Sequence, residues 1–184
     1  MSWESLETTC SLCTRCGLCQ TRNHVVFGVG VKDSAIMFVG EGPGEQEDLQ
    51  GEPFVGAAGK LLDDMLSIID LDRSKNTYIA NIVKCRPPRN RDPEPEEQAA
   101  CFGYLQEQIR MVQPKIIVCL GRIAAKKLIC EDFRITKDHG TWTEKDGIWY
   151  TAIYHPSALL RDLTKRPETF EDLLKIREKL LSMT

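Results

Sequence analysis

AIMFVGEGPG, residues 35–44, joins an apolar run of five residues to a glycine-rich turn. A short apolar run that ends at glycine is typical of a buried β-strand. Three other stretches share this character, and the stretches between them carry apolar residues at helical spacing. We therefore expect an α/β fold of three layers, α/β/α, with a central four-stranded, mainly parallel sheet. The expected strands are 35–39, 77–83, 115–120 and 149–154, and the expected helices are 57–69, 95–112, 122–129 and 168–181.

Polar residues stand at the ends of three of these strands. The GEGPG turn follows the first strand, Asn81 lies at the end of the second, and His155 follows the last. Ligands of parallel α/β sheets bind outside the carboxyl ends of the strands. The sequence therefore predicts one site at this edge of the sheet.

The composition is that of one globular domain. The chain has 184 residues, 42% hydrophobic and 28% charged, and we expect a single domain over residues 1–184. It contains no apolar run of membrane-span length and no signal-peptide pattern at its start, so we expect a cytoplasmic protein without a membrane partner. The net charge of −3 gives no general attraction to nucleic acid, so DNA binding would need local basic patches. Two such patches are Lys84, Arg86, Arg89 and Arg91, and Arg161, Lys165 and Arg166.

Four of the eight cysteines suggest a metal centre. Cys13 and Cys16 form a CxxC pair, and Cys85 and Cys101 stand alone much later in the chain. In a reducing compartment such thiols favour metal ligation over disulfides. Four thiolates from distant points suit a tetrahedral metal ion or an iron–sulfur cluster. Such a centre would staple the N-terminus to the loop after the second strand.

The other cysteines leave one alternative open. Cys10 and Cys19 extend the CxxC pair into a run that partly matches a bacterial ferredoxin motif. An electron carrier of that kind would leave Cys85 and Cys101 unused, but the run keeps the register of the N-terminal ligands open. Cys119 and Cys130 are expected to be small buried hydrophobic residues. We expect His24 and His139 at the surface, because no motif adjoins them.

Several motifs, in one order, resemble the family 4 uracil-DNA glycosylases, the iron–sulfur class of bacteria and archaea. The resemblance implies an enzyme that hydrolyses the N-glycosidic bond of uracil in DNA and leaves an abasic site. It also implies a [4Fe–4S] cluster on Cys13, Cys16, Cys85 and Cys101, with uracil-containing DNA as the partner, and we expect a monomer. The motifs are CTRCGL (13–18), VVFGVG (25–30), FVGEGPGEQED (38–48), PFVGAAGKLL (53–62), NIVKCRPPRNRDP (81–93), KIIVCLG (115–121) and YHPSALLR (154–161).

Base recognition can be assigned to three side chains. One Asn81 amide can donate to O4 of uracil and accept from N3–H, and cytosine presents the opposite pattern. Phe54 stands in a loop between Pro53 and Gly56, where a large ring can stack on the base. A turn role for Asn81 and a core role for Phe54 are the structural alternatives. The resemblance implies that Glu47 fills the space beside C5 and rejects the methyl group of thymine.

Catalysis requires stabilisation of the uracil anion that leaves. His155 is the candidate donor to O2 of the base, aided by backbone N–H groups of the loop that contains Pro43. Other uracil glycosylases place an aspartate where this chain has Gly42. Glu41 is therefore expected to position the attacking water rather than act as a strong base.

The segment after His155 is expected to hold DNA. The resemblance implies that Leu159 enters the gap left by the flipped nucleotide and that Arg161 contacts the backbone or the orphaned base. Ser157 and Arg86 are candidate DNA contacts. The main alternative to an enzyme is a non-catalytic, cluster-stapled DNA-binding module associated with a polymerase. Such a module would have no use for Asn81, Phe54 and His155 together.

Overall fold

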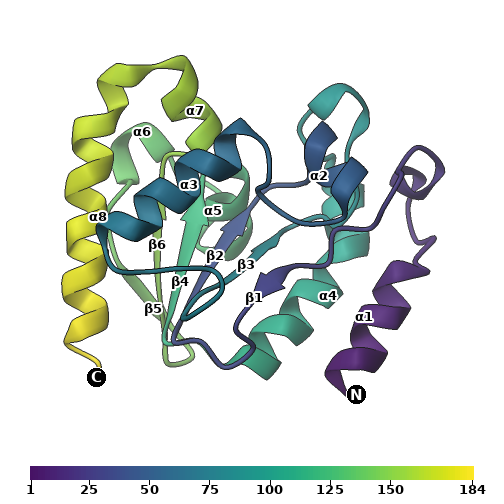
Figure 1. The fold of residues 1–184 in the computed structure, drawn as a ribbon, viewed down its shortest axis with the longest axis horizontal. Coiled ribbons are helices and arrows are strands. Elements are labelled where there is room, and N and C mark those ends of the chain that lie inside the picture. Colours follow the sequence, from purple (N-terminus) through teal and green to yellow (C-terminus); the bar gives the residue numbers. More distant parts are fainter.

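A six-stranded sheet in the order β1-β3-β2-β4-β6-β5 forms the centre of the computed structural model, which describes residues 1–184 (Figure 1). The four inner strands run parallel, which confirms the expected four-stranded core. The edge strands β1 and β5 pair antiparallel to their neighbours. They are too short to give a readable pattern in the sequence. The strands are β1 (Val29–Gly30), β2 (Ile36–Gly40), β3 (Tyr78–Asn81), β4 (Ile116–Leu120), β5 (Thr143–Lys145) and β6 (Ile148–Ile153).

Alternate residues of each inner strand point to opposite faces of the sheet, and each face is covered by its own helices. Val39 belongs to the core beneath α1, α4 and α5, whereas Phe38 belongs to the core beneath α3, α7 and α8. Every residue of β2 and β4 is buried, as expected for strands covered on both sides. The helices are α1 (Trp3–Ser11), α2 (Glu45–Gln50), α3 (Ala57–Ile68), α4 (Pro95–Val112), α5 (Arg122–Leu128), α6 (Ile135–Asp138), α7 (Pro156–Arg161) and α8 (Arg166–Leu181), with short 3-10 turns at Gly17–Gln20, Pro88–Asn90 and Leu163–Lys165.

The longest helix, α4, shows how the sequence sets these boundaries. Pro95 occupies its first turn, where a missing N–H costs nothing, and the Glu97 carboxylate accepts from the backbone N–H of Glu94 at 2.7 Å. The helix ends where Gln113 adopts a left-handed conformation, with φ of 53°. The expected bounds of this helix are confirmed at both ends.

The carboxyl ends of the parallel strands all face the end of the molecule that carries α2 and α7 (Figure 1). The loops that leave β2, β3 and β6 therefore meet there, as the sequence predicts. No helix is both long enough and apolar enough to cross a lipid bilayer.

Two expectations about single residues are wrong. The His139 side chain is only 14% exposed, because its two ring nitrogens lie 2.6 Å from Asp172 Oδ2 and 3.2 Å from Glu168 Oε2. Cys130 is exposed, because it lies in the turn after α5 rather than on its buried face. His24 is exposed and Cys119 is buried, as expected.

Candidate active site

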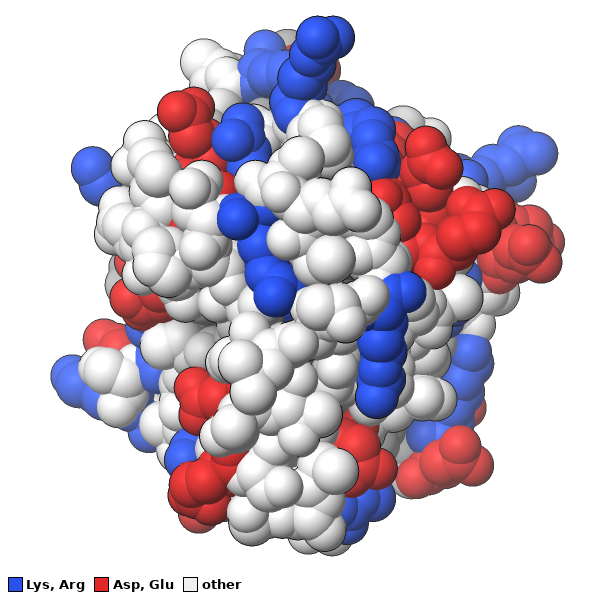
Figure 2. Space-filling model, turned by 90° about the vertical axis from the view of Figure 1, so that its right-hand side faces the viewer, with Lys and Arg blue, Asp and Glu red and all other residues white.

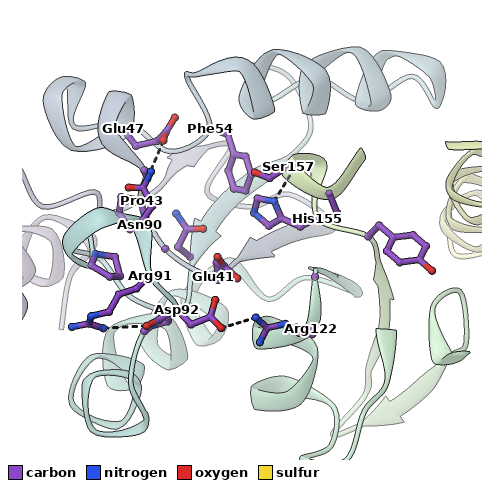
Figure 3. Close-up of a pocket in the computed structure, with 18 of the residues that line it drawn as sticks. Glu41, Pro43, Glu47, Phe54, Asn90, Arg91, Asp92, Arg122, His155 and Ser157 are labelled. Atoms are coloured by element: carbon purple, nitrogen blue, oxygen red, sulfur yellow. Dashed lines mark hydrogen bonds and ion pairs between the residues drawn. The ribbon is translucent and has the colours of Figure 1, made fainter. Parts of the chain in front are cut away.

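A cavity of about 440 Å³ opens at the carboxyl ends of the strands. Its walls come from the loops after β2, β3 and β6, together with α7 and the segment 90–93 (Figure 3). Seven residues expected to recognise or cleave the substrate line this one cavity: Glu41, Gly42, Pro43, Glu47, Phe54, Asn81 and His155. The structure thus brings together residues that are more than a hundred positions apart in the sequence.

Asn81 carries the clearest sign of an unused binding function. Its side chain is 2% exposed, and its Oδ1 atom has no hydrogen-bond partner. Leaving a buried acceptor unpaired costs about 1–3 kcal/mol, so such atoms usually await a ligand or a water molecule. The close approach of neighbouring side chains also explains why residue 40 is a glycine. A Cβ atom there would lie 2.5 Å from Asn81 Oδ1 and 2.7 Å from the Phe54 ring.

Phe54 provides an aromatic wall for the cavity. The residue is 6% exposed and has a positive φ of 53°, which is uncommon for a side chain of this size. Its ring lies beside the His155 ring, with centroids 5.6 Å apart and planes inclined by 32° (Figure 3). The Phe54 ring therefore offers a face on which a flat base can stack, with the His155 ring beside it.

His155 is held in one tautomer. The backbone N–H of Ser157 donates to His155 Nδ1 at 3.0 Å, so the ring proton of the neutral form is on Nε2. Burial lowers the pKa of His155 to about 4, and the Arg161 guanidinium acts in the same direction against the weaker opposing effect of Glu47. His155 is consequently a neutral N–H donor at pH 7.

Glu41 and Gly42 form the floor beside these groups. Burial raises the pKa of the Glu41 carboxyl, Asp92 raises it further, and Arg122 and Arg161 oppose that shift. Gly42 has little room for a side chain, because a Cβ atom would lie 2.8 Å from Val83 Cγ2. The only carboxylate on this part of the loop therefore comes from Glu41.

The Glu47 carboxylate is fully engaged with the backbone. One oxygen accepts from the N–H of Gly44 at 3.0 Å, and the other accepts from Val55 at 3.0 Å and Gly56 at 2.8 Å. Glu47 lines the cavity, yet these three bonds join the turn after β2 to the loop that carries Phe54. Its position is thus set by loop architecture.

Basic side chains surround the mouth of the cavity. Arg91, Arg122, Arg161 and Lys165 all line it, and Ser157 and Ala158 add small residues beside them. On the side of the molecule that carries α1, basic residues are spread over the face, and acidic residues gather near one edge of it (Figure 2). A local basic rim, rather than net charge, is available to attract phosphates.

Two of the expected DNA-contacting residues are buried, and a third, Arg86, stands outside the cavity, where its expected DNA contact stays a prediction. Leu159 is 2% exposed and belongs to the core under α3 and α8, so the expectation that it enters DNA is wrong for this structure; Leu160 is 43% exposed. Lys84 is 1% exposed, which removes it from the basic patch. Arg86 does not line the cavity, and its Nε donates to Asn90 Oδ1 at 2.7 Å.

Six cysteines surround a second, much smaller cavity of about 20 Å³ between α1, α4 and the loop after β3: Cys10, Cys13, Cys16, Cys19, Cys85 and Cys101. N–H groups approach three of the four expected ligands. The backbone N of Lys84 lies 3.2 Å from Cys101 Sγ, the backbone N of Arg15 lies 3.5 Å from Cys13 Sγ, and Arg22 Nη1 lies 3.5 Å from Cys85 Sγ.

A buried cation accompanies these thiols. Lys84 Nζ donates to the carbonyl of Asn81 at 3.1 Å and to Gln108 Oε1 at 2.6 Å. Burial lowers the pKa of Lys84 to about 8, and the neighbouring Cys101 and Cys10 oppose that shift. The ammonium therefore links the thiol cavity to the backbone of Asn81.

Sequence reasoning missed several residues of the larger cavity. Arg122 follows β4 directly after Gly121, so the strand-end rule that identified Asn81 also applied to it. Asp92 pairs with Arg122 at 2.5 Å and so closes one wall of the cavity (Figure 3). Asp92 and Tyr154 stand inside two of the quoted motifs, NIVKCRPPRNRDP and YHPSALLR, but no role in the site was predicted for either.

Comparison with known proteins gives a consistent result. Residues 27–180 match the family model described as the uracil DNA glycosylase superfamily. The chain is 46% identical to a type-4 uracil-DNA glycosylase of Archaeoglobus fulgidus, over 90% of this chain and 87% of that protein. It is 46% identical to one of Sulfurisphaera tokodaii, over 96% of this chain and 84% of that protein. It is 44% identical to one of Thermotoga maritima, over 90% of this chain and 88% of that protein.

Proposed function

We propose that this chain, which belongs to the type-4 uracil-DNA glycosylases of the uracil DNA glycosylase superfamily, hydrolyses the N-glycosidic bond of uracil in DNA. The products are free uracil and an abasic site, as base excision repair requires. The observation that carries this proposal is the unpartnered Oδ1 of Asn81 in a cavity walled by Phe54 and His155. A buried acceptor, an aromatic face and a neutral donor together match the edge, the face and the leaving charge of uracil.

Recognition starts from a base flipped out of the stack, because the edge that Asn81 would read is already paired inside a duplex. Asn81 Oδ1 accepts from N3–H of uracil and its Nδ2 donates to O4. Cytosine has an unprotonated N3 and an amino group at position 4, so both contacts become repulsive. Glu47 limits the space beside C5 through the loops that it ties together, which excludes the methyl group of thymine.

Cleavage follows from charge stabilisation. As the bond between C1′ and N1 breaks, its electron pair moves to the base and builds charge on O2, while the sugar becomes cationic. His155 Nε2–H donates to O2, and because the imidazole is neutral it gives no proton away. Backbone N–H groups of the turn around Pro43 add to the same stabilisation.

Water attack at C1′ completes the reaction. Glu41 orients the water for attack at C1′ of the cationic sugar, and the proton that the water loses passes to the departing uracil anion, so no strong base is required. Gly42 supplies no second carboxylate, because a Cβ atom there would already lie 2.8 Å from Val83 Cγ2. The larger share of the rate enhancement therefore comes from stabilising the leaving uracil.

A [4Fe–4S] cluster is proposed for the smaller cavity, held by Cys13, Cys16, Cys85 and Cys101. Four features support it: the shared cavity, the N–H groups near sulfur, the buried Lys84 cation that offsets the charge of thiolates, and the family. No three of the chain's His, Cys, Asp or Glu side chains stand as ligands of a single ion. Each of the four cysteines would supply one thiolate ligand to the cluster. When bound, it would supply a covalent staple between the N-terminal segment and the loop after β3.

DNA is proposed to lie across the basic rim, with Arg161, Ser157 and Arg122 near the phosphates. We propose a monomer that acts in the cytoplasm, where thiols stay reduced. A non-catalytic DNA-binding module is less well supported, because it would not need an unpartnered acceptor inside a base-sized cavity.

The test is excision from a single-uracil oligonucleotide, followed by alkali. We expect strand scission at the uracil position and none in the thymine control. Binding without scission would favour the DNA-binding module.

A further inference from the structure

The loop at Pro53–Gly56 holds Phe54 in a conformation that its own sequence does not favour. Phe54 has a φ of 53°, although it is neither glycine nor asparagine. The surrounding structure must therefore hold the backbone, because a free loop would relax to a negative φ. The position of the ring against His155 depends on that backbone.

Arg73 holds the carbonyl side of this loop. Its Nη1 donates to the Pro53 carbonyl at 2.8 Å and its Nη2 donates to the Phe54 carbonyl at 2.8 Å. Its Nε donates to Asp63 Oδ1 on α3 at 2.9 Å, and the side chain is only 14% exposed. The planar guanidinium spans two successive carbonyls, which a lysine ammonium cannot do with the same geometry.

The opposite side of the loop is held just as firmly. Glu47 accepts from the next two N–H groups, those of Val55 and Gly56. Gly59 on α3 approaches so closely that a Cβ atom there would lie within 2.0 Å of the Phe54 carbonyl group. The two carbonyls of this loop are therefore held by a cationic side chain, and the two N–H groups that follow are held by an anionic one.

We propose that Arg73 is a positioning residue for base recognition, which acts by keeping the Phe54 ring in the stacking position. Arg73 does not line the cavity, so it touches no part of the substrate. The inference rests on the proposed role of Phe54 as the stacking surface for uracil. Loss of the guanidinium frees two carbonyls and lets the ring leave its place beside His155. Affinity for the base then falls, while the donors that stabilise the leaving group remain.

The test compares Arg73→Met and Arg73→Lys with Arg110→Met as the matched control. Arg110 pairs with Glu107 on the exposed face of α4, away from the cavity. Free uracil, the product, serves as the probe, and its inhibition constant is measured together with KM and the single-turnover rate. For Arg73→Met we expect the inhibition constant and KM to rise about tenfold, with a nearly unchanged rate at saturation. A tenfold effect lies within the range of coupling energies that is typical of residues in direct contact. Arg73→Lys should fall between, and Arg110→Met should match wild type.

A double-mutant cycle with Phe54→Ala decides the mechanism. If Arg73 acts through the ring, Arg73→Met adds nothing to the loss of uracil affinity in the Phe54→Ala background. Additive losses, or an unchanged inhibition constant in folded Arg73→Met, overturn the proposal. Should Arg73→Met fail to fold, the same comparison is made with Arg73→Lys. Failure of the proposed function is distinguishable, because wild type itself would then leave uracil-containing DNA intact.

Discussion

Replacing His155 by alanine tests whether stabilisation of the uracil anion dominates the rate. The 3.0 Å bond from the Ser157 N–H to Nδ1 fixes the His155 ring, which leaves its Nε2–H as a neutral donor in the cavity. Removing one preorganised donor of this kind typically costs about 100- to 1,000-fold in rate, roughly 3 to 4 kcal/mol. DNA affinity should change little, since the donor acts on charge that is absent from the bound substrate.

The assay is single-turnover excision at saturating enzyme, with DNA affinity measured separately by fluorescence anisotropy. His24→Ala is the matched control, because His24 is exposed and lies outside the cavity. A loss below tenfold in His155→Ala would refute the reasoning, because backbone donors would then carry the stabilisation. Equal losses of rate and DNA affinity would refute it as well.

The pH dependence of stability and of excision gives a second test of His155. The pKa of His155 is about 4 in the folded chain, below the ordinary value of 6.5, because burial disfavours the imidazolium. The unfolded chain therefore binds the proton more readily between these values. The stability that neutral His155 contributes is present above pH 6.5 and is lost as pH falls towards 4, by about 3 kcal/mol at most. The ratio of the excision rates of wild type and His155→Ala should therefore stay constant from pH 5 to 8. A wild-type rate that rises as pH falls through 6.5 would indicate that His155 acts as a cation.

Further predictions concern recognition, the cluster and the core. Asn81→Asp should abolish uracil excision, because an acceptor then faces O4; full activity of Asn81→Ala on uracil would remove Asn81 as the reader of the base edge. The purified protein should be brown, and Cys85→Ser should be colourless and less stable; a colourless wild type with stoichiometric zinc after anaerobic preparation would contradict the cluster. Leu159→Ala should lower the free energy of unfolding by about 2 to 5 kcal/mol in urea titration, as for a buried leucine, and a change confined to DNA binding would speak against its core position.

Much of the fold could be predicted from local pattern. The inner strands are fully apolar runs and α4 carries its own start signals, so both were readable without tertiary information. The edge strands were not, because Val29–Gly30 and Thr143–Lys145 are too short to show a period and form only by pairing with a neighbour. Pairing partners are a property of the folded chain.

The site divides in the same way. Asn81 and His155 could be placed because strand ends meet at one edge of a parallel sheet. The orientation of Leu159 could not, because the turn of α7 decides whether it or Leu160 faces the core. The contacts of Arg73 lie about twenty residues from its position in sequence, and nothing in the chain marks a guanidinium that will bind loop carbonyls.

The most direct measurement of the central claim is the release of free uracil by the wild-type holoenzyme. A duplex or single strand with one labelled uracil is incubated with the protein, the free base is separated by chromatography, and the DNA is treated with alkali. The account predicts equal amounts of released uracil and alkali-labile sites, with neither product from thymine- or cytosine-containing controls. DNA that is bound but stays intact, with no free uracil, would contradict the account.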